Sequence, residues 1–277
     1  MTSSYPRRHA GGGWNVNLVV VGPGRAGGSI AIAASRSGHR IVGVLSRSTD
    51  RRYGPALSWE ELPPADLILI AVRDEAIEEV ADRLASICAS IPVAAHVSGY
   101  TPVAALDALA RVGLATGGFH PLQTLPDAER GADALAGSYV GIGGGAAARP
   151  ILTELALSLE MKPFALSDEV RARYHAGAAA ASNFVITALE TAGDLMAAAG
   201  IEPGVARPLV ERAVANVYDK GTTSALTGPI ARGDTTTVTG QLAAAAEVSA
   251  DIGDQYRLMA EATAIRAGRR SDTDKWT

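Results

Sequence analysis

A glycine motif between an expected strand and an expected helix constrains this chain more than any other feature. The segment NLVVVGPGRAGG predicts an apolar strand followed by Gly22, Gly24 and Gly27 in the G-x-G-x-x-G spacing. In that spacing the first glycine permits a tight turn, the second lets the backbone approach a pyrophosphate, and the third lets helix and strand pack closely. The free N–H groups at the start of the helix, with Arg25 and Ala26, would bind the phosphates. The motif predicts dinucleotide binding, and a tight strand–helix turn without a ligand is the alternative.

The residues after the second expected strand indicate which dinucleotide binds. An NAD enzyme places an acidic residue about 20 residues past the glycines, where it binds the ribose 2′-hydroxyl. This chain instead has Ser46, Arg47 and Ser48. An arginine between two hydroxyls can bind a 2′-phosphate through charge-assisted hydrogen bonds, whereas a carboxylate would repel it. We therefore expect NADP rather than NAD, and the alternative is a solvated turn.

The first half of the chain alternates short apolar runs with helical patterns, which is typical of βαβ units. Strands are expected at residues 17–21, 40–45, 66–72, 93–97, 113–119, 138–142 and 163–166, and a helix at 150–159. Most of these runs are apolar throughout, which favours a parallel sheet covered by helices on both faces. The sequence predicts an α/β, doubly wound Rossmann domain over residues 15–166, with one parallel sheet of at least six strands.

The second half of the chain carries helical periodicity and no further strand pattern. Helices are expected at residues 167–199, 204–219, 234–249 and 253–267, with an ordered glycine- and threonine-rich loop at 220–234. The length of 277 residues also favours two domains, at roughly 150 residues each. We expect an all-helical domain at 167–267 and flexible tails at 1–14 and 268–277.

Composition and charge exclude several classes of protein. The chain has 25 basic and 29 acidic residues, a balance that argues against nucleic-acid binding and against a basic membrane-binding face. The longest apolar stretch, residues 176–189, contains Ser182 and Asn183 and is too short for a membrane span. The start of the chain has no apolar signal region, and Cys88 is the single cysteine, so a cytoplasmic location is expected. No histidine has partners at metal-ligand spacing, so no metal is expected.

Polar residues follow the next strands at the edge where doubly wound sheets bind ligands. After the third strand, Ala71, Val72, Arg73 and Asp74 would border the nicotinamide half of a cofactor, or form a surface turn. The next two strands end in HVSGYTP and FHPLQTLPD, which bring two histidines and several other polar side chains to one rim. The residues of interest there are Ser98, Gly99, His120 and Gln123, with His96 either part of the pocket or a structural histidine.

Two segments of the helical half add candidate residues. On the expected helix at 167–199, His175, Ala179, Ser182 and Asn183 share one face, which forms either a pocket wall or a helix–helix contact. In the loop at 220–234, Arg232 could bind a substrate carboxylate or pair with a nearby acid.

These motifs together resemble a known family. The glycine turn, the SRS turn, HVSG, HPLQT, YHAGAAAASN and LTGPIARGD occur in this order over nearly the whole chain. The chain resembles bacterial proteins with a Rossmann-like NADP-binding domain followed by a helical domain of unknown function. That family is similar in fold to pyrroline-5-carboxylate reductase, ketopantoate reductase, prephenate dehydrogenase and the β-hydroxyacid dehydrogenases. The helical domain would be of the 6-phosphogluconate dehydrogenase C-terminal type.

The resemblance implies an NADP(H)-dependent oxidoreductase acting on a small 2-oxo acid of the ketopantoate type or on a cyclic imine, and a homodimer. His120 or His175 would donate the proton, and Ser98 and Asn183 would orient the substrate. Further substrate contacts are assigned to Gly99, Gln123, Ser182 and Arg232. The β-hydroxyacid dehydrogenases carry a lysine one turn before the asparagine, where this chain has Ala179. The alternative is therefore a non-catalytic NADP-binding regulatory or interaction protein.

Overall fold

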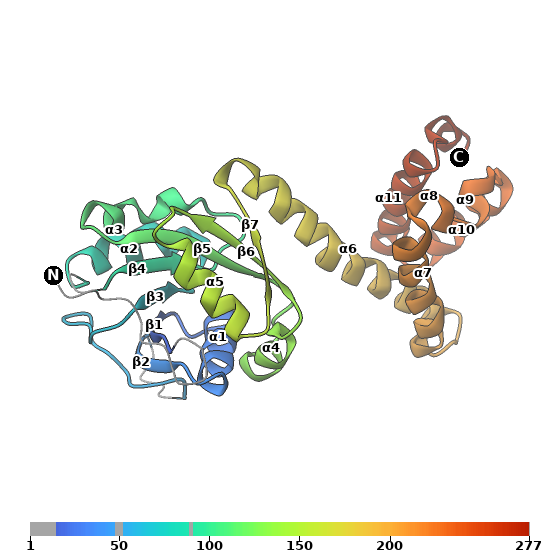
Figure 1. The fold of residues 1–277 in the computed structure, drawn as a ribbon. Coiled ribbons are helices and arrows are strands. Elements are labelled where there is room, and N and C mark those ends of the chain that lie inside the picture. Colours follow the sequence, from blue (N-terminus) through green and yellow to red (C-terminus); the bar gives the residue numbers. More distant parts are fainter. Residues whose placement is uncertain (1–14, 48–51, 89–90, 277) are drawn as a thin grey trace. The chain divides into compact units, whose positions relative to one another are not determined.

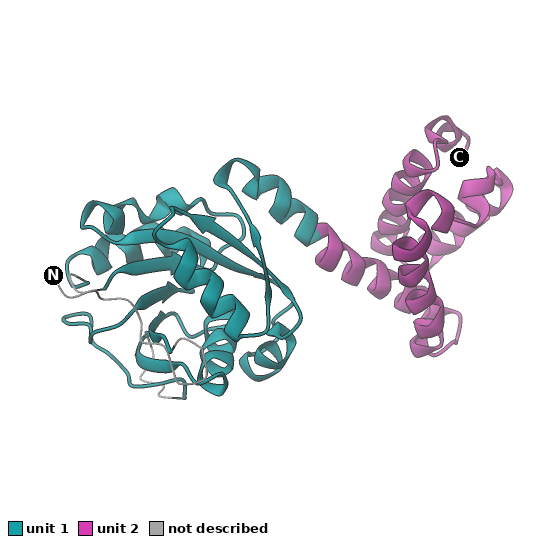
Figure 2. Ribbon diagram, viewed as in Figure 1, with its two compact units in different colours: residues 1–179 teal, residues 180–277 magenta. Residues whose placement is uncertain are grey.

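The computed structural model describes residues 15–47, 52–88 and 91–276. The chain divides into two compact units, residues 1–179 and 180–277 (Figure 2). The division falls inside helix α6 (Arg171–Ala198) rather than at residues 166 and 167. It does so because the first turns of α6 form hydrogen bonds with the sheet of unit 1, for example between Tyr174 and His120. The expected tail at 1–14 lies outside the described residues.

Unit 1 contains a seven-stranded sheet with the order β2-β1-β3-β4-β5-β6-β7 (Figure 1). Its strands are β1 (Asn17–Val21), β2 (Arg40–Leu45), β3 (Leu67–Ile70), β4 (Val93–His96), β5 (Ala115–Leu122), β6 (Tyr139–Gly144) and β7 (Lys162–Ala165). Each overlaps a strand expected from the sequence, and the doubly wound α/β class is confirmed.

The expectation of a wholly parallel sheet is wrong at one pair, because β6 runs antiparallel to β5. Leu122, the last residue of β5, is paired with Tyr139, the first residue of β6. The chain between them forms α4 (Ala128–Leu135), which packs against α1. The chain therefore enters β6 at the same end of the sheet at which it leaves β5. This pairing also lengthens β5, so His120 lies within the strand and not in the loop after it.

Helices cover both faces of the sheet (Figure 1). On one face, buried side chains of α1 (Arg25–Arg36), α4 and α5 (Arg149–Ser158) form a core with β1, β3 and β4. On the other face, α2 (Ile77–Ala85), α3 (Asp107–Arg111) and the 3₁₀ turn η2 (Val103–Leu106) form a second core. Every residue of β3 and β4 is buried. This explains why these strands are apolar throughout rather than alternating.

Unit 2 is helical, and no strand occurs among the described residues after β7. Its helices are the end of α6, α7 (Arg207–Lys220), α8 (Thr222–Ala225), α9 (Pro229–Arg232), α10 (Thr235–Val248) and α11 (Ala250–Arg266), with η4 (Pro203–Ala206) and η5 (Arg270–Lys275). The expected loop at 220–234 is partly wrong, because α8 and α9 are single helical turns within it. Gly221 and Gly228 precede these turns with φ of 78° and 92°, which only glycine adopts at little cost.

The C-terminal segment is ordered, contrary to the expected tail at 268–277. Trp276 is 3% exposed and belongs to the apolar core of unit 2 with Leu242, Ala260 and Ala264. The tail was expected because the segment is mostly polar, and one buried tryptophan gives no periodic pattern that would predict order. Among the described residues, no helix is both long enough and apolar enough to cross a membrane.

Candidate functional site

The glycine turn after β1 has the geometry that phosphate binding requires. Gly22 has a φ of 82°, and a Cβ on it would lie 2.9 Å from the Ala71 carbonyl oxygen. A Cβ on Gly27 would collide with the Gly22 carbonyl oxygen, so this glycine permits close packing of α1 on β1. Gly24 begins α1 and has open space where its Cβ would stand, and no side chain caps the helix. Free N–H groups at an uncapped helix start attract anions.

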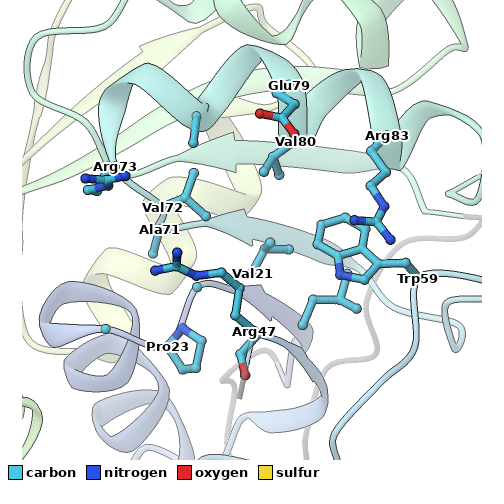
Figure 3. Close-up of a pocket in the computed structure, with 15 residues that line it drawn as sticks. Val21, Pro23, Arg47, Trp59, Ala71, Val72, Arg73, Glu79, Val80 and Arg83 are labelled. Carbon is cyan, nitrogen blue, oxygen red and sulfur yellow. The ribbon is translucent and has the colours of Figure 1, made fainter. Parts of the chain in front are cut away.

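A cavity of about 690 Å³ opens at this turn (Figure 3). It lies at the ends of β1, β2 and β3, where the strand order reverses and doubly wound folds bind ligands. Among the predicted cofactor residues, its lining includes Gly22, Gly24, Ser46, Arg47, Ala71, Val72 and Arg73. The predicted residues Arg25 and Ala26 lie at the start of α1, and Ser48 lies outside the described residues.

The cavity suits a ligand with several negative charges. Its described lining includes the guanidinium groups of Arg47, Arg73 and Arg83 and the carboxylate of Glu79. Arg47 extends from the end of β2 toward Ala71 and Arg73 (Figure 3). The Arg83 guanidinium lies over the Trp59 ring, 4.0 Å from its centroid. Sequence reasoning missed Trp59 and Arg83, because a loop tryptophan and a helix arginine carry no motif.

A second group of polar side chains gathers around Gly99, after β4. The His120 Nδ1 atom lies 2.7 Å from the Tyr174 hydroxyl oxygen, and the His120 and His175 rings are 6.0 Å apart. A Cβ on Gly99 would lie 2.7 Å from His120 Nε2 and 2.8 Å from His175 Nδ1. The two candidate proton donors therefore flank Gly99, a proximity that the sequence did not predict. Tyr174 was missed, although it directly precedes His175 in the YHAG motif.

The Ser98 hydroxyl is already engaged within unit 1. It donates a hydrogen bond of 2.7 Å to Asp74 Oδ2 and accepts from the backbone N–H groups of Tyr100 and Thr101. Ser98 thus holds Asp74, which is the next residue after Arg73 of the cavity lining. This hydrogen bond therefore joins the residue after Arg73, which lines the cavity, to the residue before Gly99, which lies against the two histidines.

The pKa values of His96 and His120 are both lowered, which favours neutral imidazoles at physiological pH. Burial, the neighbouring His175 and the Arg171 guanidinium lower the pKa of His120 to about 4, although Asp74 opposes the shift. Burial and Arg171 likewise lower the pKa of His96 to about 4. His96 is fully buried, which favours its structural role over a place in the pocket. A neutral imidazole carries one proton, so the proton donor role requires a partner that restores it.

The remaining predicted residues lie elsewhere. The Gln123 amide donates to the Ala134 carbonyl and accepts from Thr124, so it caps its own turn. Ser182, Asn183 and Arg232 belong to unit 2, and their roles stay predictions. Among the described residues, no group of three or more histidine, cysteine, aspartate or glutamate side chains could hold a metal ion.

Comparisons with known proteins identify the fold. Residues 138–263 match one family model, described as a domain of unknown function (DUF2520). No curated protein matches the sequence. Protein BF3122 from Bacteroides fragilis is similar in structure, with 21% identity over 90% of this chain and 98% of that one and a TM-score of 0.77.

Two further structures contain a nicotinamide cofactor. A reductive aminase from Aspergillus terreus in complex with NADPH and ethyl-5-oxohexanoate is 17% identical, covering 95% of this chain and 100% of that one, with a TM-score of 0.64. A pyrroline carboxylate reductase from Plasmodium falciparum with NADP bound is 12% identical over 95% and 100%, with a TM-score of 0.61. This chain has their fold. It is a Rossmann domain followed by a helical region, as the resemblance implied.

Proposed function

We propose that the protein is an NADP(H)-dependent reductase that transfers a hydride to a small 2-oxo acid or a cyclic imine. The observation that carries this proposal is the arginine-lined cavity at the glycine turn. The histidine group belongs to the same unit, and the Asp74–Ser98 hydrogen bond joins the residues next to Arg73 and Gly99. The similarity in fold to a reductive aminase with NADPH and a pyrroline carboxylate reductase with NADP supports it.

The residues present fit the dinucleotide. The open space at Gly24 and the uncapped start of α1 would receive the pyrophosphate. Arg47 and Ser46, at the end of β2, would bind the 2′-phosphate, and Ser48 completes the predicted set. Ala71 and Val72 would border the nicotinamide. When bound, NADPH supplies the hydride for the reaction.

The histidine group would supply the proton. As the hydride reaches the substrate carbon, the carbonyl oxygen or imine nitrogen becomes basic, and an imidazole N–H of His120 or His175 can protonate it. The Ser98 hydroxyl is engaged by the Asp74 carboxylate and by two backbone N–H groups. We therefore assign Ser98 to positioning Asp74 rather than to direct contact with the substrate. Gly99, which lies against both imidazoles, would border the substrate. Substrate contacts of Gln123, Ser182, Asn183 and Arg232 stay predictions from the sequence.

We also propose that the protein is a homodimer whose interface includes the apolar side chains that unit 2 leaves exposed. Phe184 is 68%, Leu209 70% and Tyr218 85% exposed. The buried apolar cluster among the described residues of unit 2 has only five members, Val238, Leu242, Ala260, Ala264 and Trp276. Large apolar side chains left exposed beside so small a core favour an interface with another chain. Light scattering during size-exclusion chromatography should give twice the mass of one chain, and Phe184→Glu should give a monomer.

The remaining partners follow from charge and composition. The net charge of −4 favours a small-molecule substrate over nucleic acid or an anionic membrane. The single cysteine, Cys88, is buried and suits a cytoplasmic location.

Steady-state oxidation of NADPH tests the proposed reaction. A panel of small 2-oxo acids and cyclic imines would be incubated with the protein and NADPH, and the loss of reduced-nicotinamide absorbance followed. Turnover with a member of either class supports the proposal. Tight NADPH binding without turnover across the panel would instead favour a regulatory or interaction protein.

A further inference from the structure

The Tyr174–His120 contact is held in one geometry by its surroundings. The Tyr174 hydroxyl lies 2.7 Å from His120 Nδ1, and the two rings meet edge-on at 88°. On its other side the Tyr174 ring packs against Phe164, with centroids 5.6 Å apart. The Tyr174 hydroxyl therefore forms a hydrogen bond with His120 Nδ1, while His120 Nε2 lies against Gly99.

Arg171 is buried beside this pair and lies three residues before Tyr174 on α6. Its side chain is 1% exposed, and its Nε atom donates a hydrogen bond of 2.7 Å to Asp168 Oδ1. Its Nη1 atom donates to the Ser98 carbonyl at 3.1 Å. Its Nη2 atom lies against Gly118 and Gly143, which face each other on β5 and β6, and a Cβ on either would displace it. The sheet is thus shaped around this guanidinium.

We propose that Tyr174 and His120 form a proton relay to the substrate, with Arg171 as the positioning residue that fixes its direction. This inference rests on the proposed reductase function. In the resting state the Tyr174 hydroxyl donates to His120 Nδ1, so the single imidazole proton is on Nε2. During reduction the Nε2 proton goes to the substrate oxygen or nitrogen, and the Tyr174 proton moves to Nδ1. The resting state returns when Nε2 takes a proton from water and the Nδ1 proton moves back to the Tyr174 phenolate.

The charge of Arg171 favours this direction, whereas burial opposes it at Tyr174. The charged and titratable groups that influence His120 are His175, Arg171, Asp74 and His96, and their effects together with burial leave its pKa at about 4. An imidazolium is therefore disfavoured, and the proton must pass through a neutral ring. Burial raises the pKa of Tyr174 to about 12, but Arg171 acts in the opposite direction and stabilises the phenolate. The same buried cation thus disfavours the protonated histidine and favours the deprotonated tyrosine.

The tautomer of His120 tests the relay without any cofactor or substrate. Nitrogen NMR of the full-length protein labelled in histidine distinguishes a proton on Nε2 from one on Nδ1. The relay predicts that His120 at neutral pH is neutral and carries its proton on Nε2, and that Tyr174→Phe loses this single-tautomer signature. Tyr139→Phe is the matched control, because it removes an exposed hydroxyl from β6 of the same unit and should change nothing. A proton on Nδ1 in the unmodified protein overturns the relay.

Arg171 has a separate readout. Arg171→Met should raise the pKa of His120 in the same NMR titration, and Arg171→Lys should keep it low because it retains the charge. Thermal unfolding reports whether either variant is folded. If the methionine variant is folded and the pKa of His120 stays at about 4, the role of Arg171 is refuted. A correct tautomer without NADPH oxidation would refute only the proposed function, whereas turnover with the opposite tautomer would refute only the relay.

Discussion

Replacing Arg47 with alanine should weaken NADPH binding and leave NADH binding nearly unchanged. Arg47 lines the cavity at the carboxyl end of β2, where the 2′-phosphate is expected, and NADH has no phosphate there. A hydrogen bond to a charged group contributes about 1.5–3 kcal/mol, and about 1.4 kcal/mol corresponds to a tenfold change in affinity. Because the side chain is exposed, solvent screening favours the lower half of that range. The expected loss of NADPH affinity is therefore about 10- to 40-fold.

Isothermal titration of both cofactors at one fixed salt concentration measures this difference. Arg40→Ala is the matched control, because Arg40 is an exposed residue at the opposite end of β2 and its removal changes the net charge equally. Both affinities should be nearly unaffected in that variant. Equal binding of NADPH and NADH by the unmodified protein, or equal losses for both cofactors in Arg47→Ala, would refute the assignment of the 2′-phosphate to this turn.

Three further predictions concern the histidine group. His120→Ala or His175→Ala should lower turnover by roughly 10²–10⁴-fold while NADPH affinity stays nearly constant, and unchanged turnover in both would exclude histidine proton transfer. Gly99→Ala should displace both imidazoles and lower turnover without changing NADPH affinity, as kinetics and titration would show. The free energy of unfolding should fall as the pH drops from 6.5 toward about 4. Over that range His96 and His120 bind protons in the unfolded chain but not in the folded one, and denaturant unfolding that is constant over it contradicts this.

The strands of the sheet were predictable because burial on both faces leaves a strong local pattern. β1 and β2 match the expected ranges to the residue, since each is an apolar run that ends at a turn. The direction of β6 was not predictable from its apolar run, which has the same composition in either orientation. It accompanies the packing of α4 against α1, a contact between segments far apart in the sequence.

The cofactor half of the site was more predictable than the histidine half. The glycine turn is a local device, and its residues lie where the spacing placed them. The Tyr174–His120 and Arg171–Ser98 contacts join a helix to strand ends more than 50 residues earlier. No local pattern marks a tyrosine or an arginine for such a role. The burial of Trp276 was not predicted for a similar reason, because its neighbours in the sequence are polar and form no apolar pattern.

Hydride transfer from NADPH to the substrate is tested most directly with NADPH that carries deuterium on the nicotinamide ring. A single turnover with a cyclic imine or a small 2-oxo acid, analysed by mass spectrometry, follows the label from cofactor to substrate. A reductase of this kind leaves one deuterium on the reduced carbon of the product, and His120→Ala should transfer it much more slowly at saturating cofactor. A protein that binds NADPH tightly and transfers no deuterium to any member of either substrate class would contradict the proposed function.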